Sequence, residues 1–126
     1  MARPLVLVVE DEPTLREPLE KFLAVHGFDV HSETTADGAL AWLTGQTPDA
    51  AVVDLRLPGG SGRDVVNAMP QPTPVIIFSA VPNESGHLET RRPHTKLVLK
   101  PFSLTMIAEM LRKMLATGEA ESIRVK

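Results

Sequence analysis

Four short apolar runs constrain what this chain can fold into more than any other feature of its sequence. Each run is bounded by charged residues, proline or small polar residues, and the four occupy residues 5–9, 50–53, 75–78 and 97–99. Their apolar character is continuous rather than alternating, which is typical of strands buried on both faces in a parallel sheet. A fifth stretch, residues 28–32, alternates between apolar and polar residues and therefore fits a less buried strand at a sheet edge.

Apolar residues at helical spacing fill the stretches between these runs. The clearest stripe comprises Leu104, Ile107, Ala108, Leu111 and Leu115. Thr35 and Ser103 are predicted to cap the second and last helices at their N-termini. Gly27, Gly45 and Gly118 are predicted to end the first, second and last helices.

The helices in the middle of the chain have weaker signals. Residues 63–69 predict a short helix that ends at the prolines after it, and residues 83–92 predict a weak one that ends at Pro93. Pro18 falls inside the first helical pattern, where its missing N–H predicts a distorted first turn or a late helix start. Trp42 lies off the apolar stripe of the second helix, so we expect it to be half exposed and to pack at the helix edge.

Strands that alternate with helices five times indicate a three-layer, doubly wound α/β sandwich with right-handed crossovers. A length of 126 residues fits a single domain. We assign this domain to residues 1–118 and a frayed C-terminal tail to residues 119–126. In such a fold the ligand site is expected at the carboxyl ends of the strands.

Composition argues against several classes of function. The net charge of −3 and a pI near 5.8 argue against a direct nucleic-acid surface. A small basic group is expected to be solvated instead; it consists of Arg91, Arg92, His94 and Lys96. The sequence has no Cys, which excludes disulfides and thiol catalysis, and its four His lack the spacing of a zinc site. The first apolar run is too short for a signal sequence or a membrane span, so we expect a cytoplasmic protein without membrane contact.

Charged and polar residues follow the predicted strands at the edge where the carboxyl ends meet. Glu10 and Asp11 follow the first strand, Asp54 the third, Ser79 the fourth and Lys100 the fifth. Each pair of carboxylates in such a group repels by about 4 kcal/mol at ~4 Å if the effective dielectric constant is near 20. The lysine and a hard divalent cation, usually Mg²⁺ beside phosphate, would offset this repulsion. Because the chain has no Cys and no identifiable Ser–His pair, the group that accepts phosphorus would be a carboxylate.

Three motifs occupy these strand ends. They are Val-Val-Glu-Asp-Glu at residues 8–12, Val-Asp-Leu-Arg-Leu-Pro at 53–58 and Leu-Lys-Pro-Phe at 99–102, with Ser79 between the last two. In this order they resemble the receiver domain of two-component response regulators, the CheY-like family, over about residues 4–117. The resemblance implies a flavodoxin-like fold with a five-stranded parallel sheet of order 2-1-3-4-5. It also implies a cis bond between Lys100 and Pro101.

The resemblance further implies that Asp54 accepts a phosphoryl group from a histidine kinase or a histidine phosphotransfer protein. Asp54 and Asp11 would bind Mg²⁺ directly, and Glu10 would act largely through bound water. The backbone carbonyl of Arg56 would complete the protein ligands. Such a protein is not otherwise an enzyme, since it catalyses only its own phosphorylation and dephosphorylation.

A conformational switch is implied by the same resemblance. Lys100 would bind phosphoryl oxygens, and the Ser79 hydroxyl would turn inward to donate to the phosphate, altering a surface that binds a downstream protein effector. The family commonly has an aromatic switch residue three places before the lysine, where this sequence has Leu97. Ring rotation therefore cannot be the readout here. Arg56 and Val81 would tune the lifetime of the phosphoryl group, unless they are plain surface residues.

Two other functions are compatible with the sequence. Leu97 and the short link between Asp54 and Ser79 allow a pseudo-receiver, an interaction module that is not phosphorylated. A haloacid-dehalogenase-type phosphatase also forms an aspartyl phosphate, but that family carries Asp-x-Asp after its first strand, whereas Asp54 follows a middle strand and lacks the second acid. Because nothing after Gly118 resembles an output domain, we expect a stand-alone regulator, with homodimerisation through the last helix left open.

Overall fold

The computed structural model describes the backbone of residues 3–81 and 83–125, and the side chains of residues 3–81 and 83–116. Five strands form one parallel sheet: β1 (Leu5–Val9), β2 (Asp29–Glu33), β3 (Ala50–Asp54), β6 (Val75–Ser79) and β7 (Thr95–Leu99). Their spatial order is β2-β1-β3-β6-β7, which is 2-1-3-4-5 when these five are counted along the chain. The predicted flavodoxin-like sheet is confirmed, with the alternating stretch at one edge as β2.

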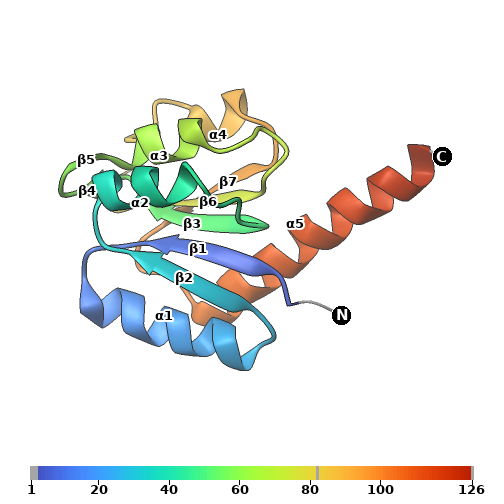
Figure 1. The fold of residues 1–126 in the computed structure, drawn as a ribbon, viewed down its shortest axis with the longest axis horizontal. Helices are drawn as coiled ribbons and strands as arrows, with labels where there is room; N and C mark the ends of the chain where they lie inside the picture. The colour runs from blue at the N-terminus through green and yellow to red at the C-terminus, as the bar shows by residue number, and fades with distance from the viewer. Residues whose placement is uncertain (1–2, 82, 126) are drawn as a thin grey trace.

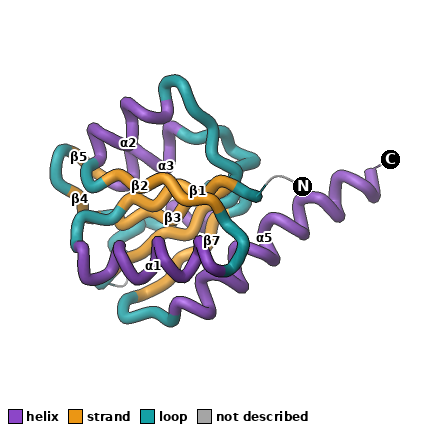
Figure 2. The backbone as a smooth tube through the Cα atoms, turned by 60° about the horizontal axis from the view of Figure 1, so that its bottom comes forward, coloured by secondary structure: helices purple, strands orange, loops and turns teal. Residues whose placement is uncertain are grey.

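Helices cover both faces of this sheet (Figure 1). One face carries α1 (Pro13–Val25) and α5 (Leu104–Val125), and the other carries α2 (Ala36–Leu43), α3 (Gly62–Ala68) and α4 (Leu88–Arg91). Figure 2 shows the same three layers from another direction. Within the described part of the chain, no helix is both long enough and apolar enough to cross a membrane.

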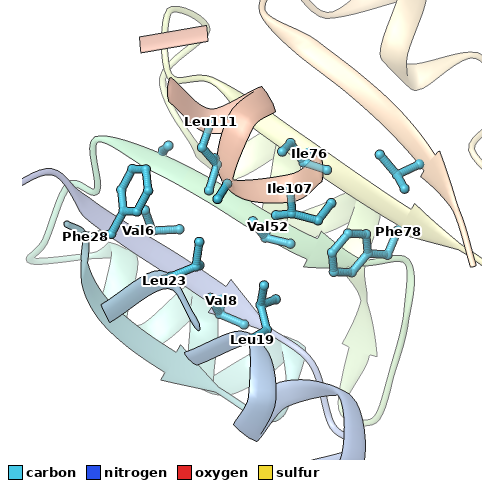
Figure 3. Close-up of a cluster of buried hydrophobic side chains, with 13 residues drawn as sticks. Val6, Val8, Leu19, Leu23, Phe28, Val52, Ile76, Phe78, Ile107 and Leu111 are labelled. Carbon is cyan, nitrogen blue, oxygen red and sulfur yellow. The ribbon is translucent and has the colours of Figure 1, made fainter. Parts of the chain in front are cut away.

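Two apolar clusters hold the layers together, one on each face of the sheet. In β1, Val6 and Val8 pack toward α1 and α5, while Leu7 and Val9 pack toward α2 and α3. Figure 3 shows the first of these clusters, in which side chains from the sheet meet Leu19, Leu23, Ile107 and Leu111. Neighbouring residues of a strand therefore enter different cores, which explains why the apolar runs are continuous.

The predicted effect of Pro18 on the first helix and the predicted end of the last helix are wrong. α1 begins at Pro13, where a missing N–H is harmless, and its first turn is closed by the amide of Arg16, which donates to the carbonyl of Glu12 at 2.9 Å. Pro18 therefore causes neither a late start nor an open first turn. Gly118 does not end α5, which continues to Val125. A glycine inside a helix costs only about 1 kcal/mol, and the Ala and Glu residues around it favour helix.

The middle of the chain differs most from the prediction. α3 lies close to the expected position, but α4 has only four residues because left-handed backbone at Asn83 and His87 (φ 70° and 65°) interrupts any longer helix. A small antiparallel hairpin that was not predicted, β4 (Arg56–Leu57) with β5 (Gly60–Ser61), follows β3. The predicted caps at Thr35 and Ser103 are confirmed by side-chain hydrogen bonds to backbone amides.

Candidate functional site

The parallel strands bring the predicted site residues together at the edge of the sheet that is formed by the carboxyl ends of the strands. Asp54 is the last residue of β3 and Ser79 the last residue of β6, while Glu10 and Lys100 come directly after β1 and β7. The parallel register aligns these strand ends with one another. The site thus occupies the position expected for a ligand site in a doubly wound sheet.

Three carboxylates gather at this edge. One carboxylate oxygen from each of Glu10, Asp11 and Asp54 lies within 4.8 Å of the others. Glu10 and Asp54 are almost fully buried, with 1% and 4% of their surface exposed, whereas Asp11 is exposed. Buried like charges at this spacing are stable only beside positive charge.

Lys100 supplies one positive charge to the cluster. Its Nζ donates to Oδ2 of Asp54 at 2.6 Å and lies 3.4 Å from Oε1 of Glu10. Partial burial alone lowers the pKa of Lys100, but the hydrogen bond and charge of Asp54, helped by Glu10, outweigh burial and raise this pKa above its ordinary value. The amine is therefore a full cation at neutral pH and lies directly on the predicted acceptor.

Glu10 lies in an environment that disfavours its charge. Burial, with a further contribution from the charge of Asp54, raises the pKa of Glu10 to about 7. The amide of Glu12 donates to Oε2 of Glu10 at 3.2 Å, and this bond and the charge of Lys100 limit the rise. At neutral pH the metal-free site is thus poised between a protonated and an ionised Glu10.

A divalent cation fits this donor set. Oε1 of Glu10 is buried and accepts no hydrogen bond from the described residues, and its contact with the Lys100 ammonium is an ion pair at 3.4 Å. The amide of Arg56 donates to Oδ1 of Asp54 at 3.0 Å, which places the backbone at position 56 beside the carboxylates. An unsatisfied carboxylate oxygen among further carboxylates suits a hard cation such as Mg²⁺. The cluster could therefore hold a metal, and the individual ligand roles stay predictions.

The raised pKa of Glu10 leads to a pH prediction for stability. In metal-free buffer, the free energy of unfolding should fall by on the order of 3 kcal/mol as pH rises from about 4.5 to 7. Between these two pH values the folded state largely keeps a proton on Glu10, whereas the unfolded chain has largely released it. Urea denaturation at several pH values measures the effect.

The matched variant for this experiment is Glu10→Gln, which cannot titrate at position 10. Its free energy of unfolding should change less over the same pH range, so the two profiles converge toward acid and diverge toward neutral pH. Parallel profiles for the wild type and the variant would contradict the assigned environment of Glu10.

Ser79 is fully buried, and its hydroxyl is directed to the loop that follows β6. Its Oγ lies 2.8 Å from the backbone oxygen of Val81 and 2.8 Å from Oε1 of Glu84, and it accepts from the amide of Val81 at 3.2 Å. Val81 itself is exposed. The hydroxyl is predicted to turn inward when the protein is phosphorylated. In the structure of the unphosphorylated chain, it is directed to the loop instead.

Glu84 is a site residue that was not predicted. Its Oε2 pairs with the guanidinium of Arg56, so it joins Arg56 to Ser79. Burial raises the pKa of Glu84, but the hydrogen bonds from Ser79 and Arg56 and the charge of Arg56 lower it more, and the net shift is downward. Glu84 lies in turns without any periodic pattern, so no local signal in the sequence distinguishes it.

Leu97 and Gly62 also bear on the site. Leu97 lies in β7, is partly buried and packs against the core under α2 and α3.

Gly62, the first residue of α3, lies so close to the backbone of Asp54 that a Cβ at this position would be 2.0 Å from the Asp54 carbonyl oxygen. Gly62 was not predicted as a site residue, because close packing against a distant strand leaves no local mark in the sequence.

The prediction that the basic group, which runs from the end of α4 into β7, is solvated is wrong for one of its members. Arg92 is buried, and its guanidinium donates to the carbonyls of Pro70 and Thr73 at 2.6 and 2.9 Å and to Oγ1 of Thr95. It therefore secures the loop before β6, while its neighbour Arg91 is exposed.

Trp42 is half-buried as predicted and stacks on His31, with ring centroids 4.4 Å apart. The predicted cis bond before Pro101 is confirmed.

Known proteins share both the sequence pattern and the fold. The family model of the response regulator receiver domain matches residues 6–112. The transcriptional regulatory protein KdpE of Mycobacterium tuberculosis is 34% identical over 111 residues, covering 86% of this chain and 49% of KdpE. The transcriptional regulatory protein PrrA of the same organism is 32% identical over 134 residues, covering 97% of this chain and 57% of PrrA.

The chain thus spans about half the length of these curated relatives. Among solved structures, a CheY-like response regulator receiver domain protein from Methanospirillum hungatei has the same fold. Its TM-score is 0.85 at 20% identity, with 95% of this chain and 99% of that chain covered.

Proposed function

The chain belongs to the response regulator receiver domain family, and on this premise we propose that it is a signalling receiver switched by phosphorylation of Asp54. The observation that carries the proposal is the contact of the Lys100 ammonium with Asp54, at 2.6 Å, beside two further carboxylates. A buried nucleophilic carboxylate, a cation fixed on it and a cation-binding donor set are the parts that phosphoryl transfer needs.

In the proposed reaction an oxygen of Asp54 forms a bond to phosphorus. The bond between phosphorus and a histidine nitrogen of the donor breaks, and that nitrogen keeps the electron pair. Lys100 holds a phosphoryl oxygen in place and offsets its charge, and the Ser79 hydroxyl donates a hydrogen bond to another phosphoryl oxygen. Mg²⁺, when held by Asp54, Asp11, Glu10 and the carbonyl of Arg56, would neutralise charge on the phosphoryl oxygens.

The reaction ends when water attacks phosphorus and releases inorganic phosphate, which restores the carboxylate of Asp54. The chain is therefore proposed to act on itself alone and not on a separate substrate. Arg56 and Val81 are exposed and lie two residues after Asp54 and Ser79, where they could limit the approach of water. Their proposed effect is on the lifetime of the phosphorylated state.

The proposed phosphoryl donor is a sensor histidine kinase or a histidine phosphotransfer protein in the cytoplasm, and the proposed reader is a downstream protein effector. KdpE and PrrA are named transcriptional regulatory proteins, and this chain covers only about half of each. Regulation of transcription is therefore one proposed output, through a partner or another part of a longer protein. The net charge of −3 argues against DNA contact by this domain itself.

Incubation with acetyl phosphate and Mg²⁺ tests the proposal. The intact mass of the wild type should increase by one phosphoryl group, and the mass of Asp54→Asn should not, because an amide is not nucleophilic. Removal of Mg²⁺ with EDTA should abolish the increase. Asp64→Asn is the matched control, since Asp64 is exposed in the first turn of α3 and should leave phosphorylation unchanged.

The other outcomes identify the competing functions. Continuous phosphate release from many phosphate esters without a lasting adduct would indicate a phosphatase. An unchanged mass under all these conditions would indicate a pseudo-receiver that binds partners without phosphorylation.

A further inference from the structure

The hydroxyl of Ser79 is engaged in bonds that conflict with its proposed role. A hydroxyl has one proton to donate, and the two acceptors within reach are the backbone oxygen of Val81 and Oε1 of Glu84, each at 2.8 Å. Neither of them is a phosphoryl oxygen, which is the acceptor that the proposed role of Ser79 requires. Of the two, the carboxylate is the stronger acceptor, because hydrogen bonds to ionised groups are about twice as strong as neutral ones.

Glu84 is held in this position from three directions. Its Oε2 pairs with Arg56, its Oε1 accepts from Ser79, and its backbone oxygen accepts from Nη2 of Arg63 at 3.2 Å. The Glu84 side chain is 17% exposed, whereas that of Arg56 is 71% exposed. A shielded carboxylate with charged and neutral donors on its two oxygens is an ordered bridge between the end of β6 and the residue two places after Asp54.

We propose that Glu84 is a positioning residue that holds the Ser79 hydroxyl away from the phosphoryl site until Asp54 is phosphorylated. This inference rests on the proposed function above. The phosphoryl group adds about −1.5 to −2 charges at Asp54 and provides strong acceptor oxygens. Ser79 can donate to them only if its bond to Glu84 breaks. The phosphoryl oxygens on Asp54 and the carboxylate of Glu84 therefore compete for the single hydrogen bond that the Ser79 hydroxyl can donate.

Release of Glu84 also supplies a readout that does not need an aromatic residue at position 97. Glu84 lies in the segment that joins β6 to α4, and α4 is only a single turn long (Figure 1). The segment is attached to the site through the Ser79 contact and to α3 through Arg63. Loss of the Ser79 contact therefore alters the support of α4 directly, while Leu97 keeps its place in the core.

The energetic consequence is a lowered affinity for phosphoryl groups in the wild type. If Ser79 is free to bind in only a fraction of the molecules, the apparent affinity falls by that fraction. Removal of the Glu84 carboxylate removes this competition. Val81 then remains as the alternative acceptor, but a carbonyl competes less strongly than a carboxylate.

Binding of beryllofluoride, a stable mimic of the phosphoryl group on a carboxylate, tests the inference by calorimetry at fixed Mg²⁺. Glu84→Ala should lower the dissociation constant about tenfold, which corresponds to 1.4 kcal/mol. In a Ser79→Ala background, Glu84→Ala should lower the dissociation constant about threefold or less. No hydroxyl is left to be released there, so only the loss of the negative charge of Glu84 still changes the affinity. This difference between backgrounds is a readout that a merely structural role of Glu84 would not produce.

Glu89→Ala is the matched control. Glu89 accepts from the hydroxyl of Ser85 at 2.5 Å, so it forms the same kind of Ser–Glu pair in the same stretch of chain but away from the site. Its removal should leave the beryllofluoride affinity unchanged. Thermal melting of each variant shows that the fold is kept.

Failure of the inference and failure of the proposed function give different results. If the wild type binds beryllofluoride but Glu84→Ala does not bind it more tightly, or gains equally in both backgrounds, the role assigned to Glu84 is wrong and the receiver function stands. If the wild type neither binds beryllofluoride with Mg²⁺ nor gains mass from acetyl phosphate, the proposed function itself is wrong, and the role of Glu84 falls with it.

Discussion

Replacement of Lys100 by methionine should slow the phosphorylation of Asp54 by a factor of about 10² to 10³, the usual cost of removing one group that stabilises transition-state charge. The Lys100 ammonium lies 2.6 Å from Asp54 Oδ2, and the nearby Glu10 adds negative charge. Methionine has a similar length and an apolar end, so the variant loses the charge while the stem of the side chain keeps its packing. Intact mass followed over time with acetyl phosphate and Mg²⁺ measures the rate.

Lys96→Met is the matched control for this prediction. Lys96 lies in β7, the strand that Lys100 directly follows, and is exposed. Its replacement should leave the rate of phosphorylation within about twofold of the wild type, and urea denaturation should show that both variants are folded. A Lys100→Met protein that is phosphorylated as fast as Lys96→Met would show that the ammonium has no part in the transfer.

Substitution of Gly62 by alanine should lower the free energy of unfolding by about 4 kcal/mol or more, a large share of the total for a small domain. A Cβ at position 62 would lie 2.0 Å from the Asp54 carbonyl oxygen and 2.8 Å from the Cα of Leu55. Both are backbone atoms, which cannot move aside as the end of a flexible side chain would. Either α3 or the end of β3 must shift, so phosphorylation of Asp54 should slow as well.

The control for Gly62 is Gly45→Ala. A Cβ at position 45 meets no atom within 4 Å, and this glycine follows α2 on the surface. Its replacement should change the free energy of unfolding by no more than about 0.5 kcal/mol. Equal urea midpoints for the two alanine variants would mean that α3 does not pack against the acceptor strand as closely as described.

The sheet and the acidic site could be predicted from the sequence because both follow from burial. A strand covered on both faces must be apolar at every position, as Val6 and Leu7 illustrate by entering opposite cores. The first polar residues after such strands lie where the strands end. The parallel order then brings Asp54, Glu10 and Lys100 together without any knowledge of their side-chain geometry.

Features that depend on distant partners could not be predicted in this way. Glu84 reaches Ser79 because turns with left-handed residues direct the chain back toward the site, and such turns have no periodic pattern. Arg92 is buried although its neighbour Arg91 is exposed, since it binds carbonyls about 20 residues earlier in the chain, including that of Thr73. The continuation of α5 past Gly118 has a different cause, since it depends on the helix-forming residues next to the glycine.

The most direct test of the central claim is to locate the phosphoryl group. Borohydride reduces an acyl phosphate to an alcohol and leaves free carboxylates unchanged, so the phosphorylated residue acquires a permanent mark. After treatment with acetyl phosphate, Mg²⁺ and borohydride, peptide mass spectrometry should find a reduced side chain at Asp54 and at no other acidic residue. Reduction at a different carboxylate, or at none, would contradict the assignment of Asp54 as the acceptor.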